Sequence, residues 1–282
     1  MTNWNLPKSK CNDYEARFRE IISDPLNLMI SRVPDAGYLE SNHVTLHNGV
    51  KVKIEGEYSY YDKFSKILLL NRGVHEPLEE FVFQELMKKI NEFPRMIELG
   101  AYWGHYSIWL KITKPNSILD LVEPDINNLN TGKYNFENND INLENVRFIN
   151  EKVGKDYFSI DEYMKKNNIH HLDILHSDIQ GYELEMIIGA LDSFKKRLID
   201  YVFISTHSNI IHYNILARLG LFEYRIEVSS DFENETTSFD GFIFASSPNV
   251  KPLLPNFRPL HRSEIAHSTT TDLVNYIKNI TQ

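Results

Sequence analysis

The chain has 282 residues, 42% of them hydrophobic and 24% charged, and its formal net charge is −9. This is the composition of a globular protein with a sizeable core, and its acidity makes a nucleic acid or an anionic membrane a poor default partner. The single cysteine, Cys11, excludes an intrachain disulfide and a cysteine-cluster metal site within this sequence.

Residues 1–75 are predicted to form an N-terminal extension. Segment 44–54 alternates apolar and polar residues around Asn48-Gly49, which predicts a β-hairpin. Residues 75–91 predict a helix, because Pro77 suits a first helical turn and the apolar side chains form one stripe. The polar start predicts no signal peptide, and no apolar run is long enough to span a membrane, so we expect a cytoplasmic protein.

Strand and helix patterns alternate after residue 94. The expected strands are 96–99, 118–122, 146–149, 172–176, 201–205, 223–228 and 241–246, and the expected helices are 104–112, 125–138, 160–167, 181–197 and 210–218. This alternation predicts an α/β fold with a doubly wound, Rossmann-like, seven-stranded and mostly parallel sheet. A polar loop joins the last two strands, so the last strand is expected to be antiparallel. The resulting domain spans 76–248, and a tail with a short helix near 271–279 spans 249–282.

Two strand ends carry the residues of a predicted ligand site. Residues 95–104 read RMIELGAYWG, and residues 121–125 read LVEPD. Ligands of open α/β sheets bind beyond the carboxyl ends of the strands, and a Cβ at Gly100 or Gly104 would push a ligand away. Glu98 could accept a hydrogen bond from a ligand ammonium or amide, and Glu123 could accept two from ribose hydroxyls.

Several ligands compete for this site. A dinucleotide fold needs a glycine where this chain has Tyr102, which would clash with a pyrophosphate. A phosphate-free, positively charged ligand such as S-adenosylmethionine fits both Tyr102 and the acid before Gly100. The alternative is an ordinary pair of turn glycines without a ligand, and Glu123 after the second strand argues against it.

The chain resembles the class I S-adenosylmethionine-dependent methyltransferases and, among them, the FkbM family, over about 73–247. The similar segments are GVHEPLEEFVF (73–83), IELGAYWGHYSIWL (97–110), LVEPD (121–125), NEKVG (150–154), SIDEYM (159–164), LDILHSDIQGYELEMIIGAL (172–191), FISTHS (203–208) and GFIFAS (241–246). Three positions depart from the family pattern. Tyr102 stands where Asn is common, Gln180 where Glu is common, and Ser205 where an acid usually precedes His207.

Motif and resemblance together imply a set of cofactor-binding residues. They are Glu98, Gly100, Ala101, Tyr102, Gly104, Ser107, Glu123, Pro124, Asp125, Glu151, Lys152, Val153 and Asp178. The resemblance implies S-adenosyl-L-methionine as the cofactor, with the adenine held near residues 150–154.

Methyl transfer is an in-line displacement, and a hydroxyl acceptor benefits from a nearby base. Asp178 and Gln180 follow the fourth strand, and His207 follows the fifth. We interpret Asp178 as orienting the donor or acceptor and His207 as the general base, although helix capping could explain Asp178 and simple exposure His207. Asp178, Glu183 and His207 could bind Mg²⁺, but their spacing is not diagnostic, so no metal is predicted. His105 beside the glycine loop is a minor catalytic candidate.

The resemblance implies an O-methyltransferase that acts on a hydroxyl of a small molecule or of a sugar or glycan. The acidic loop 229–240 could help to bind a polyol. Alternatives are a non-catalytic S-adenosylmethionine-binding subunit and an N-methyltransferase of a small molecule. Residues 177–181 lack the Asn/Asp-Pro-Pro-aromatic motif of amino-directed nucleic-acid methyltransferases, and Tyr102 disfavours a dehydrogenase. We therefore expect no nucleic-acid or membrane partner, and a homo-oligomer is left open.

Overall fold

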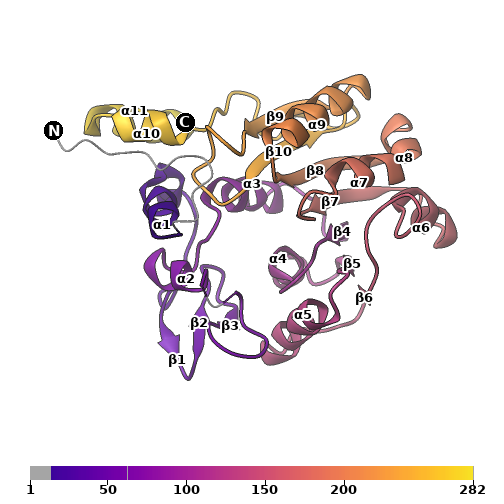
Figure 1. Ribbon diagram of the computed structural model, residues 1–282, viewed down its shortest axis with the longest axis horizontal. Helices are drawn as coiled ribbons and strands as arrows, with labels where there is room; N and C mark the ends of the chain where they lie inside the picture. The colour runs from indigo at the N-terminus through magenta and orange to yellow at the C-terminus, as the bar shows by residue number, and fades with distance from the viewer. Residues whose placement is uncertain (1–13, 62, 282) are drawn as a thin grey trace.

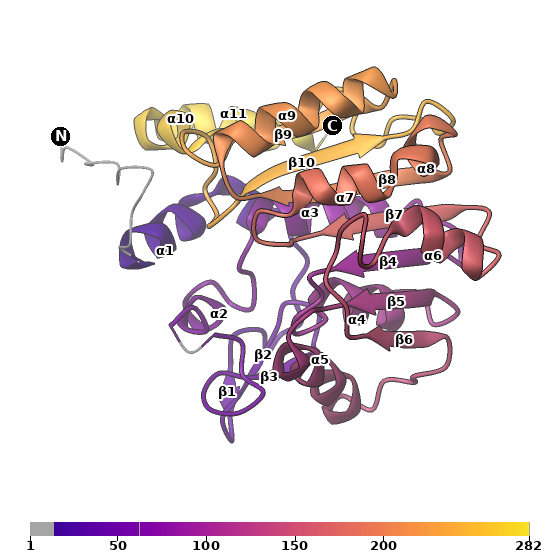
Figure 2. The same ribbon diagram turned by 45° about the vertical axis from the view of Figure 1, so that its right-hand side comes forward.

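The computed structural model describes residues 14–61 and 63–281, so Cys11 lies outside the described part (Figure 1). Seven strands form one sheet in the order β6-β5-β4-β7-β8-β10-β9, which Figure 2 shows from the bottom to the top of the molecule. They are β4 (Arg95–Leu99), β5 (Ile118–Val122), β6 (Val146–Ile149), β7 (Leu172–Ser177), β8 (Ile199–Thr206), β9 (Arg225–Ser230) and β10 (Gly241–Ser246). β10 pairs antiparallel with β8 and β9, whereas the pairs among β4 to β8 are parallel. The predicted doubly wound sheet with an antiparallel last strand is confirmed.

Helices cover both faces of the sheet. Neighbouring residues of a strand point to opposite faces, so Met96 and Ile97 show which helices lie on each face. Met96 belongs to a cluster with apolar residues of α3 (Pro77–Met87), α4 (His105–Thr113) and α5 (Ile126–Asn138). Ile97 belongs to a second cluster with apolar residues of α6 (Ile160–Lys166), α7 (Glu183–Gly189), α8 (Leu191–Lys195) and α9 (Asn209–Leu221). The short apolar strands predicted this arrangement correctly.

One predicted helix is wrong. The pattern over 181–197 predicts a single helix, but the structure has two short ones, α7 and α8, that meet at Ala190. Ala190 has φ −121 and ψ 17, outside the helical region. The hydroxyl of Ser159 donates a hydrogen bond of 2.8 Å to the carbonyl of Gly189, which competes with a helical partner. The break is therefore a tertiary effect that periodicity does not show.

The N-terminal extension contains the predicted hairpin. β2 (His43–Thr45) pairs antiparallel with β3 (Lys51–Lys53), Gly49 in the connecting turn has φ +91, and the short β1 (Leu39–Glu40) joins the other side of β2. The sequence reasoning missed α1 (Tyr14–Ser23), the 3₁₀ helix η1 (Pro25–Leu28) and α2 (Lys66–Leu70). Val44 and Val52 of the hairpin share a core cluster with Met96 of the sheet. The extension therefore packs against the sheet domain, and a domain boundary at residue 75 stays a prediction.

The C-terminal tail contains two helices, α10 (Arg262–His267) and the predicted α11 (Thr270–Ile280). Both lie at the same end of the molecule as α1 and above it in Figures 1 and 2. Arg262 lies 3.9 Å from the carboxylate of Glu20 in α1 and donates to the carbonyl of Asn234 in loop 229–240. In the same loop the hydroxyl of Thr237 donates to Asp24 at 2.6 Å. These contacts join the extension, the tail and loop 229–240. Within the described ranges, every helix is too short or too polar to cross a membrane.

Candidate active site

The glycine loop lies where three strand ends converge. The N–H groups of Gly100 and Ala101 donate to the carbonyl of Val122 at 2.9 and 3.1 Å, which ties the end of β4 to β5. The N–H of Asp178 donates to the carbonyl of Leu99 at 2.9 Å and so ties β4 to β7. Gly100 has φ +72, and a Cβ there would lie 1.7 Å from the carbonyl oxygen of Asp178. Glycine is therefore required at this position by both conformation and space.

Gly104 and Glu98 make contacts within the protein that the sequence did not predict. A Cβ on Gly104 would lie 3.4 Å from Leu121 and Phe136, so this position is closely packed by the protein itself, and its contact with a ligand stays a prediction. Gly104 has φ +72 and precedes α4. The buried carboxylate of Glu98 accepts hydrogen bonds from the backbone N–H and the hydroxyl of Ser107. Both bonds hold the start of α4 in place, and contact of Glu98 or Ser107 with a ligand stays a prediction.

The carboxylate of Glu123 lies directly after β5, and its contact with a ribose diol stays a prediction. One oxygen accepts from the N–H of Tyr102 at 3.2 Å, and the other accepts from the N–H of Asp125 at 3.0 Å. Burial raises the pKa of Glu123 despite these bonds. The amide of Asn128 also lies 3.4 Å from the oxygen that accepts from Asp125, so the oxygen that faces Tyr102 is the less occupied of the two. The amide of Asn150, which sequence reasoning missed, donates to the backbone carbonyls of Glu123 and Pro124 at 2.9 Å each and fixes this edge of the crevice.

The segment after β6 borders the same edge. Val153 is buried, whereas Glu151 is exposed. The ammonium of Lys152 donates to the hydroxyl of Tyr182 at 2.7 Å and lies 3.9 Å from the centre of its ring. Lys152 thus bridges the end of β6 to the start of α7, and its contact with a cofactor stays a prediction.

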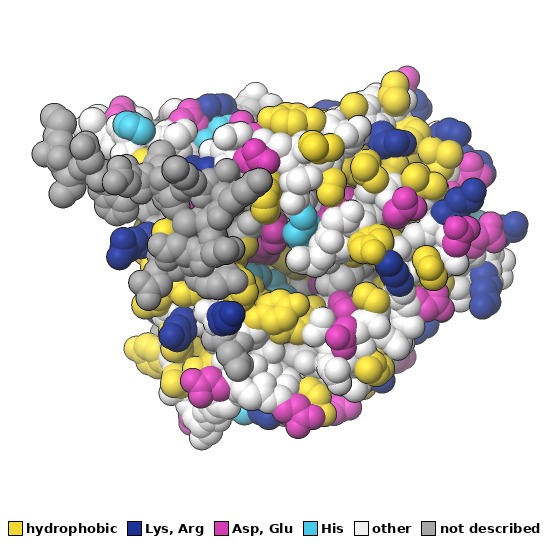
Figure 3. All heavy atoms as spheres, in the orientation of Figure 1, with side chains coloured by type: hydrophobic (Ala, Val, Ile, Leu, Met, Phe, Trp, Pro, Cys, Tyr) yellow, Lys and Arg dark blue, Asp and Glu magenta, His cyan; other side chains and the backbone are white. Residues whose placement is uncertain are grey.

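Four titratable side chains meet beyond the carboxyl ends of β7 and β8. We call Asp178, Glu183, His207 and Asp240 the mouth cluster. Nδ1 of His207 lies 2.6 Å from Glu183, and its Nε2 lies 3.2 Å from Asp178 and 3.3 Å from Asp240. The exposed Gln180, at φ +51, places its amide 3.4 Å from Asp178. The sequence predicted the grouping of Asp178, Gln180 and His207 but missed Asp240. Figure 3 shows acidic and histidine side chains in a hollow near the centre of one face.

Contacts among the members of the mouth cluster, together with burial, shift the pKa values of His207, Asp240 and Asp178. Burial lowers the pKa of His207, but its contacts with Asp178 and Glu183 outweigh burial and raise this pKa to about 11. Burial raises the pKa of Asp240 to about 7 even though the charge of His207 opposes this. Burial also raises the pKa of Asp178, but the hydrogen bond with His207 outweighs it and the net shift is downward. These shifts favour a charged His207 and a proton-accepting Asp240 near neutral pH. The role of His207 as the general base stays a prediction.

A carboxylate from α3 lies beneath the mouth cluster. Glu79 lies 2.6 Å from Nε2 of His176, and the hydroxyl of Ser205 donates to it at 3.0 Å. Ser205 stands where the family pattern usually has an acid, and the carboxylate of Glu79 lies beside it. The sequence showed Glu79 only as an acid in a first helical turn, so this contact was not foreseen.

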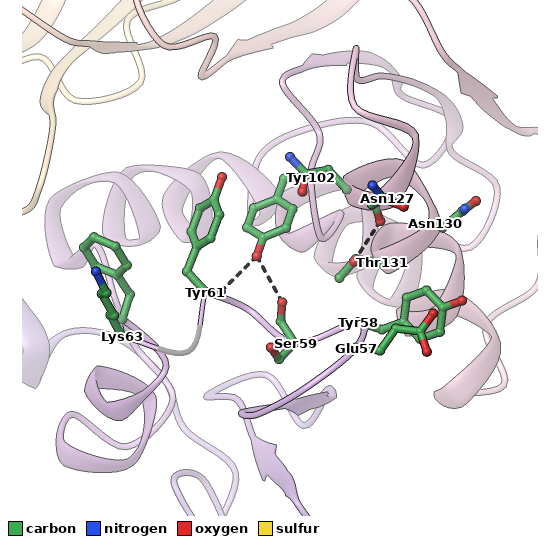
Figure 4. A pocket seen from close by; sticks show the side chains of 11 residues that line it. Glu57, Tyr58, Ser59, Tyr61, Lys63, Tyr102, Asn127, Asn130 and Thr131 are labelled. Carbon is green, nitrogen blue, oxygen red and sulfur yellow. Dashed lines mark hydrogen bonds between the residues drawn. The ribbon is translucent and has the colours of Figure 1, made fainter.

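Residues 59–61 of the extension cover the glycine loop. The hydroxyl of Tyr102 donates to the carbonyl of Ser59 at 3.0 Å and accepts from the N–H of Tyr61 at 2.9 Å, as Figure 4 shows. Tyr60 stacks on Trp103 with 4.5 Å between ring centres. Burial raises the pKa of the Tyr61 hydroxyl, and the charges of Glu123 and Asp178 raise it further. The Tyr61 ring lies 4.5 Å from that of Tyr102 and so borders the glycine loop, although the sequence showed only an aromatic-rich run.

A pocket of about 730 Å³ lies between this covering segment and α5 (Figure 4). Its lining residues combine aromatic rings, amides and hydroxyls, and they include Tyr58, Tyr61, Tyr102, Asn127, Asn128 and Thr131. Asn128 also places its amide 3.4 Å from Glu123, which connects the pocket to the crevice.

Comparisons with known proteins give one family. The model of the methyltransferase FkbM domain matches residues 43–240. No curated protein matches the chain in sequence.

Similar solved structures share little sequence with the chain. Methyltransferase FkbM from Methylobacillus flagellatus KT is 18% identical, with 56% of this chain and 44% of that chain covered and a TM-score of 0.45. Precorrin-6y C5,15-methyltransferase from Geobacter metallireducens GS-15 is 14% identical, with 60% and 86% covered and a TM-score of 0.44. M. capricolum TrmK in complex with S-adenosyl-homocysteine is 16% identical, with 71% and 82% covered and a TM-score of 0.43. The chain thus spans less than half of the first of these structures, and likenesses at this level inform neither substrate nor mechanism.

Proposed function

The chain belongs to the FkbM family of S-adenosylmethionine-dependent methyltransferases, and from this membership we propose that it methylates a hydroxyl of a small molecule or of a sugar. The family resemblance favours a hydroxyl acceptor, and the observation that supports it in the structure is the carboxylate of Asp240, which lies 3.3 Å from Nε2 of His207 beyond the strand ends. This carboxylate is placed to take the proton that a hydroxyl loses on methylation, and burial raises its pKa to about 7.

The residues of the crevice fit S-adenosylmethionine. The Glu123 oxygen that faces Tyr102 can accept from one ribose hydroxyl, and the other oxygen can accept from the second hydroxyl in place of its long contact with Asn128. Asn150 fixes the backbone beside it. Tyr102 stands where a pyrophosphate would need a glycine. The acids Glu123 and Asp178 on either side favour a cationic ligand. When bound, the cofactor supplies a methyl group that is already activated by the positive sulfur.

The mouth cluster would prepare the acceptor. Asp240 takes the hydroxyl proton, while His207 remains charged and holds Asp240 and Asp178 in place from 3.3 and 3.2 Å. Burial holds the pKa of the Tyr60 hydroxyl well above its usual value, with smaller upward effects from acids that include Asp178 and Asp240. Tyr60 therefore stays protonated, and its ring stacks on Trp103 beside the glycine loop. Orientation in line with the donor supplies the rest of the rate enhancement.

The pocket beside Tyr61 supports a sugar-like acceptor, because aromatic rings with a few placed polar groups are typical of small-molecule sites. One observation favours a second candidate, N-methylation of an amine. In the mouth cluster three carboxyl groups face a single histidine, and this excess of negative charge would attract an ammonium. A cytoplasmic location and a homo-oligomer remain predictions from the sequence.

Acceptor pairs that differ in one group test this proposal. The chain is incubated with S-adenosylmethionine and either a sugar or the matching amino sugar, and S-adenosylhomocysteine and the methylated product are measured. We expect product from hydroxyl acceptors. Product from the amine alone would support N-methylation instead. Tight cofactor binding without turnover on a broad panel would support a non-catalytic subunit.

The assignment of Glu123 predicts a loss of cofactor affinity. Glu123→Gln removes the charge and places an N–H where an acceptor is needed, so binding of S-adenosylmethionine should weaken by about 1–3 kcal/mol. Isothermal titration calorimetry measures this change, with Glu137→Gln on the exposed surface of α5 as the control. Equal affinities of the two variants would show that the ribose does not bind at Glu123.

A further inference from the structure

A second group of histidines lies buried away from the mouth cluster. His47 follows β2 in the extension, Glu80 lies in α3, and His105 is the first residue of α4. Their relative exposures are 1%, 0% and 3%. Three segments far apart in the sequence thus bring two imidazoles and a carboxylate together inside the protein.

The atoms that face one another in this group lack hydrogen-bond partners. Nε2 of His47 lies 3.1 Å from one oxygen of Glu80, and Nε2 of His105 lies 3.9 Å from the other. One donor atom from each of the three residues lies within 4.8 Å of the other two. However, Nε2 of His47, Oε2 of Glu80 and both ring nitrogens of His105 make no hydrogen bond within the described structure. Buried polar atoms without partners are costly and rare, so these need another explanation.

The surroundings fix the orientation of Glu80. Its Oε1 accepts from the backbone N–H groups of His75 and Glu76 at 2.9 and 3.1 Å, and Nδ1 of His75 lies 2.7 Å from it. This arrangement leaves Oε2 directed at His47. The His105 ring stacks on Trp103 with 4.9 Å between centres. Partners that orient ligand side chains from behind are typical of metal sites in proteins.

We propose that His47, Glu80 and His105 bind a divalent transition-metal ion of the zinc type. Two imidazoles and one carboxylate are a common ligand set for Zn²⁺, with metal–ligand bonds of about 2.0–2.2 Å. Ligand atoms around such a tetrahedral ion are roughly 3.4 Å apart by the same bond lengths. The two separations end on different oxygens of Glu80: Nε2 of His47 lies 3.1 Å from Oε2 and Nε2 of His105 lies 3.9 Å from Oε1. Closing the site therefore requires the His105 side chain to turn toward Oε2.

Charge and access also agree with a bound cation. Glu80 is fully buried, and its hydrogen bonds all end on Oε1, so a cation at Oε2 would offset the cost of burying this carboxylate. A surface pocket of about 520 Å³ is lined by His47 and Trp109, and it offers an entry path to the group. The ion would connect the extension to α3 and to the start of α4, directly after the glycine loop.

Metal content of the full chain tests the site. The chain is purified without a histidine tag and analysed by plasma mass spectrometry, and we expect on the order of one zinc-type ion per chain. His105→Gln and His47→Gln should each reduce this content at least about tenfold. His171→Gln is the control, because it disrupts another grouping of possible ligands, the more exposed His171, Asp173 and Asp200. Metal retained in His105→Gln but lost in His171→Gln would overturn the proposal.

A second measurement avoids variants that fail to fold. The unchanged chain is stripped with a strong chelator, and its thermal unfolding is followed before and after Zn²⁺ is restored. We expect the midpoint to fall on stripping and to recover with Zn²⁺, and Co²⁺ to give the visible absorption of a tetrahedral site. A metal-free chain with an unchanged midpoint and no Co²⁺ absorption would show that the group is a metal-free network of histidines and acids.

Discussion

Asp240→Asn should lower kcat by about 10²–10⁴-fold, the usual contribution of a positioned general base. The amide is close in size to the carboxylate and can still accept a hydrogen bond from His207, but it cannot take a proton from the acceptor. Cofactor affinity should change little, because the ribose and adenine positions lie at Glu123 and beyond. Single-turnover kinetics and calorimetry on the same variant separate the two effects.

The pH dependence of turnover supplies an independent check on Asp240. Burial raises the pKa of Asp240 to about 7, so the carboxylate is protonated below this pH and ionised above it. Turnover should therefore rise with pH through about 7, and this rise should disappear in Asp240→Asn. The apparent value belongs to the mouth cluster as a unit, because Asp178 and Asp240 share the charge of His207.

Glu233→Gln is the matched control, since it removes an acid from the same loop outside the mouth cluster. It should retain both the rate and the pH profile. If Asp240→Asn keeps most of the turnover, or if its profile still rises through pH 7, another group takes the proton. His207 would be that group only if bound cofactor brought the pKa of His207 down from about 11 to near neutral.

The sheet was largely predictable from the sequence because its strands are short apolar runs. The bounds of β5, β6 and β10 agree with those expected from residues 118–122, 146–149 and 241–246. Buried parallel strands give such apolar runs wherever helices cover both faces of the sheet, so each strand can be predicted from its own residues. The helix break at Ala190 was not readable, because it depends on Ser159, a residue far away in the sequence.

Only part of the candidate site could be predicted, because some of its residues reach it through tertiary packing. Asp178 and His207 directly follow predicted strands, and topology alone brings the carboxyl ends of such strands together. Glu79, Tyr61 and Asp240 reach the site from a helix, the extension and a loop. Loop 229–240 was expected at this mouth of the sheet, but nothing in the sequence singles out Asp240 within it or shows that Glu79 and Tyr61 reach the site. Their contribution depends on tertiary packing, such as the contact between Glu79 and His176.

Gly100→Ala should lower the free energy of unfolding by about 2–5 kcal/mol, which combines the cost of a left-handed alanine with that of overpacking. Gly100 has φ +72, and its new Cβ would lie 1.7 Å from the carbonyl oxygen of Asp178. The backbone must therefore move at the point where β4, β5 and β7 meet. Such a shift displaces Asp178 from His207 and alters the loop that would hold the cofactor, so turnover should be lost as well.

Gly56→Ala separates the steric clash from the conformational cost. Gly56 has φ +79 and nothing within 4 Å of an added Cβ, so this variant carries the cost of a left-handed alanine alone, about 1–2 kcal/mol. Denaturant unfolding of both variants gives the difference. Equal losses of stability would mean that the loop moves freely away from Asp178. The three strand ends would then not be fixed against one another, and the crevice between Gly100 and Glu123 would not be preformed for a cofactor.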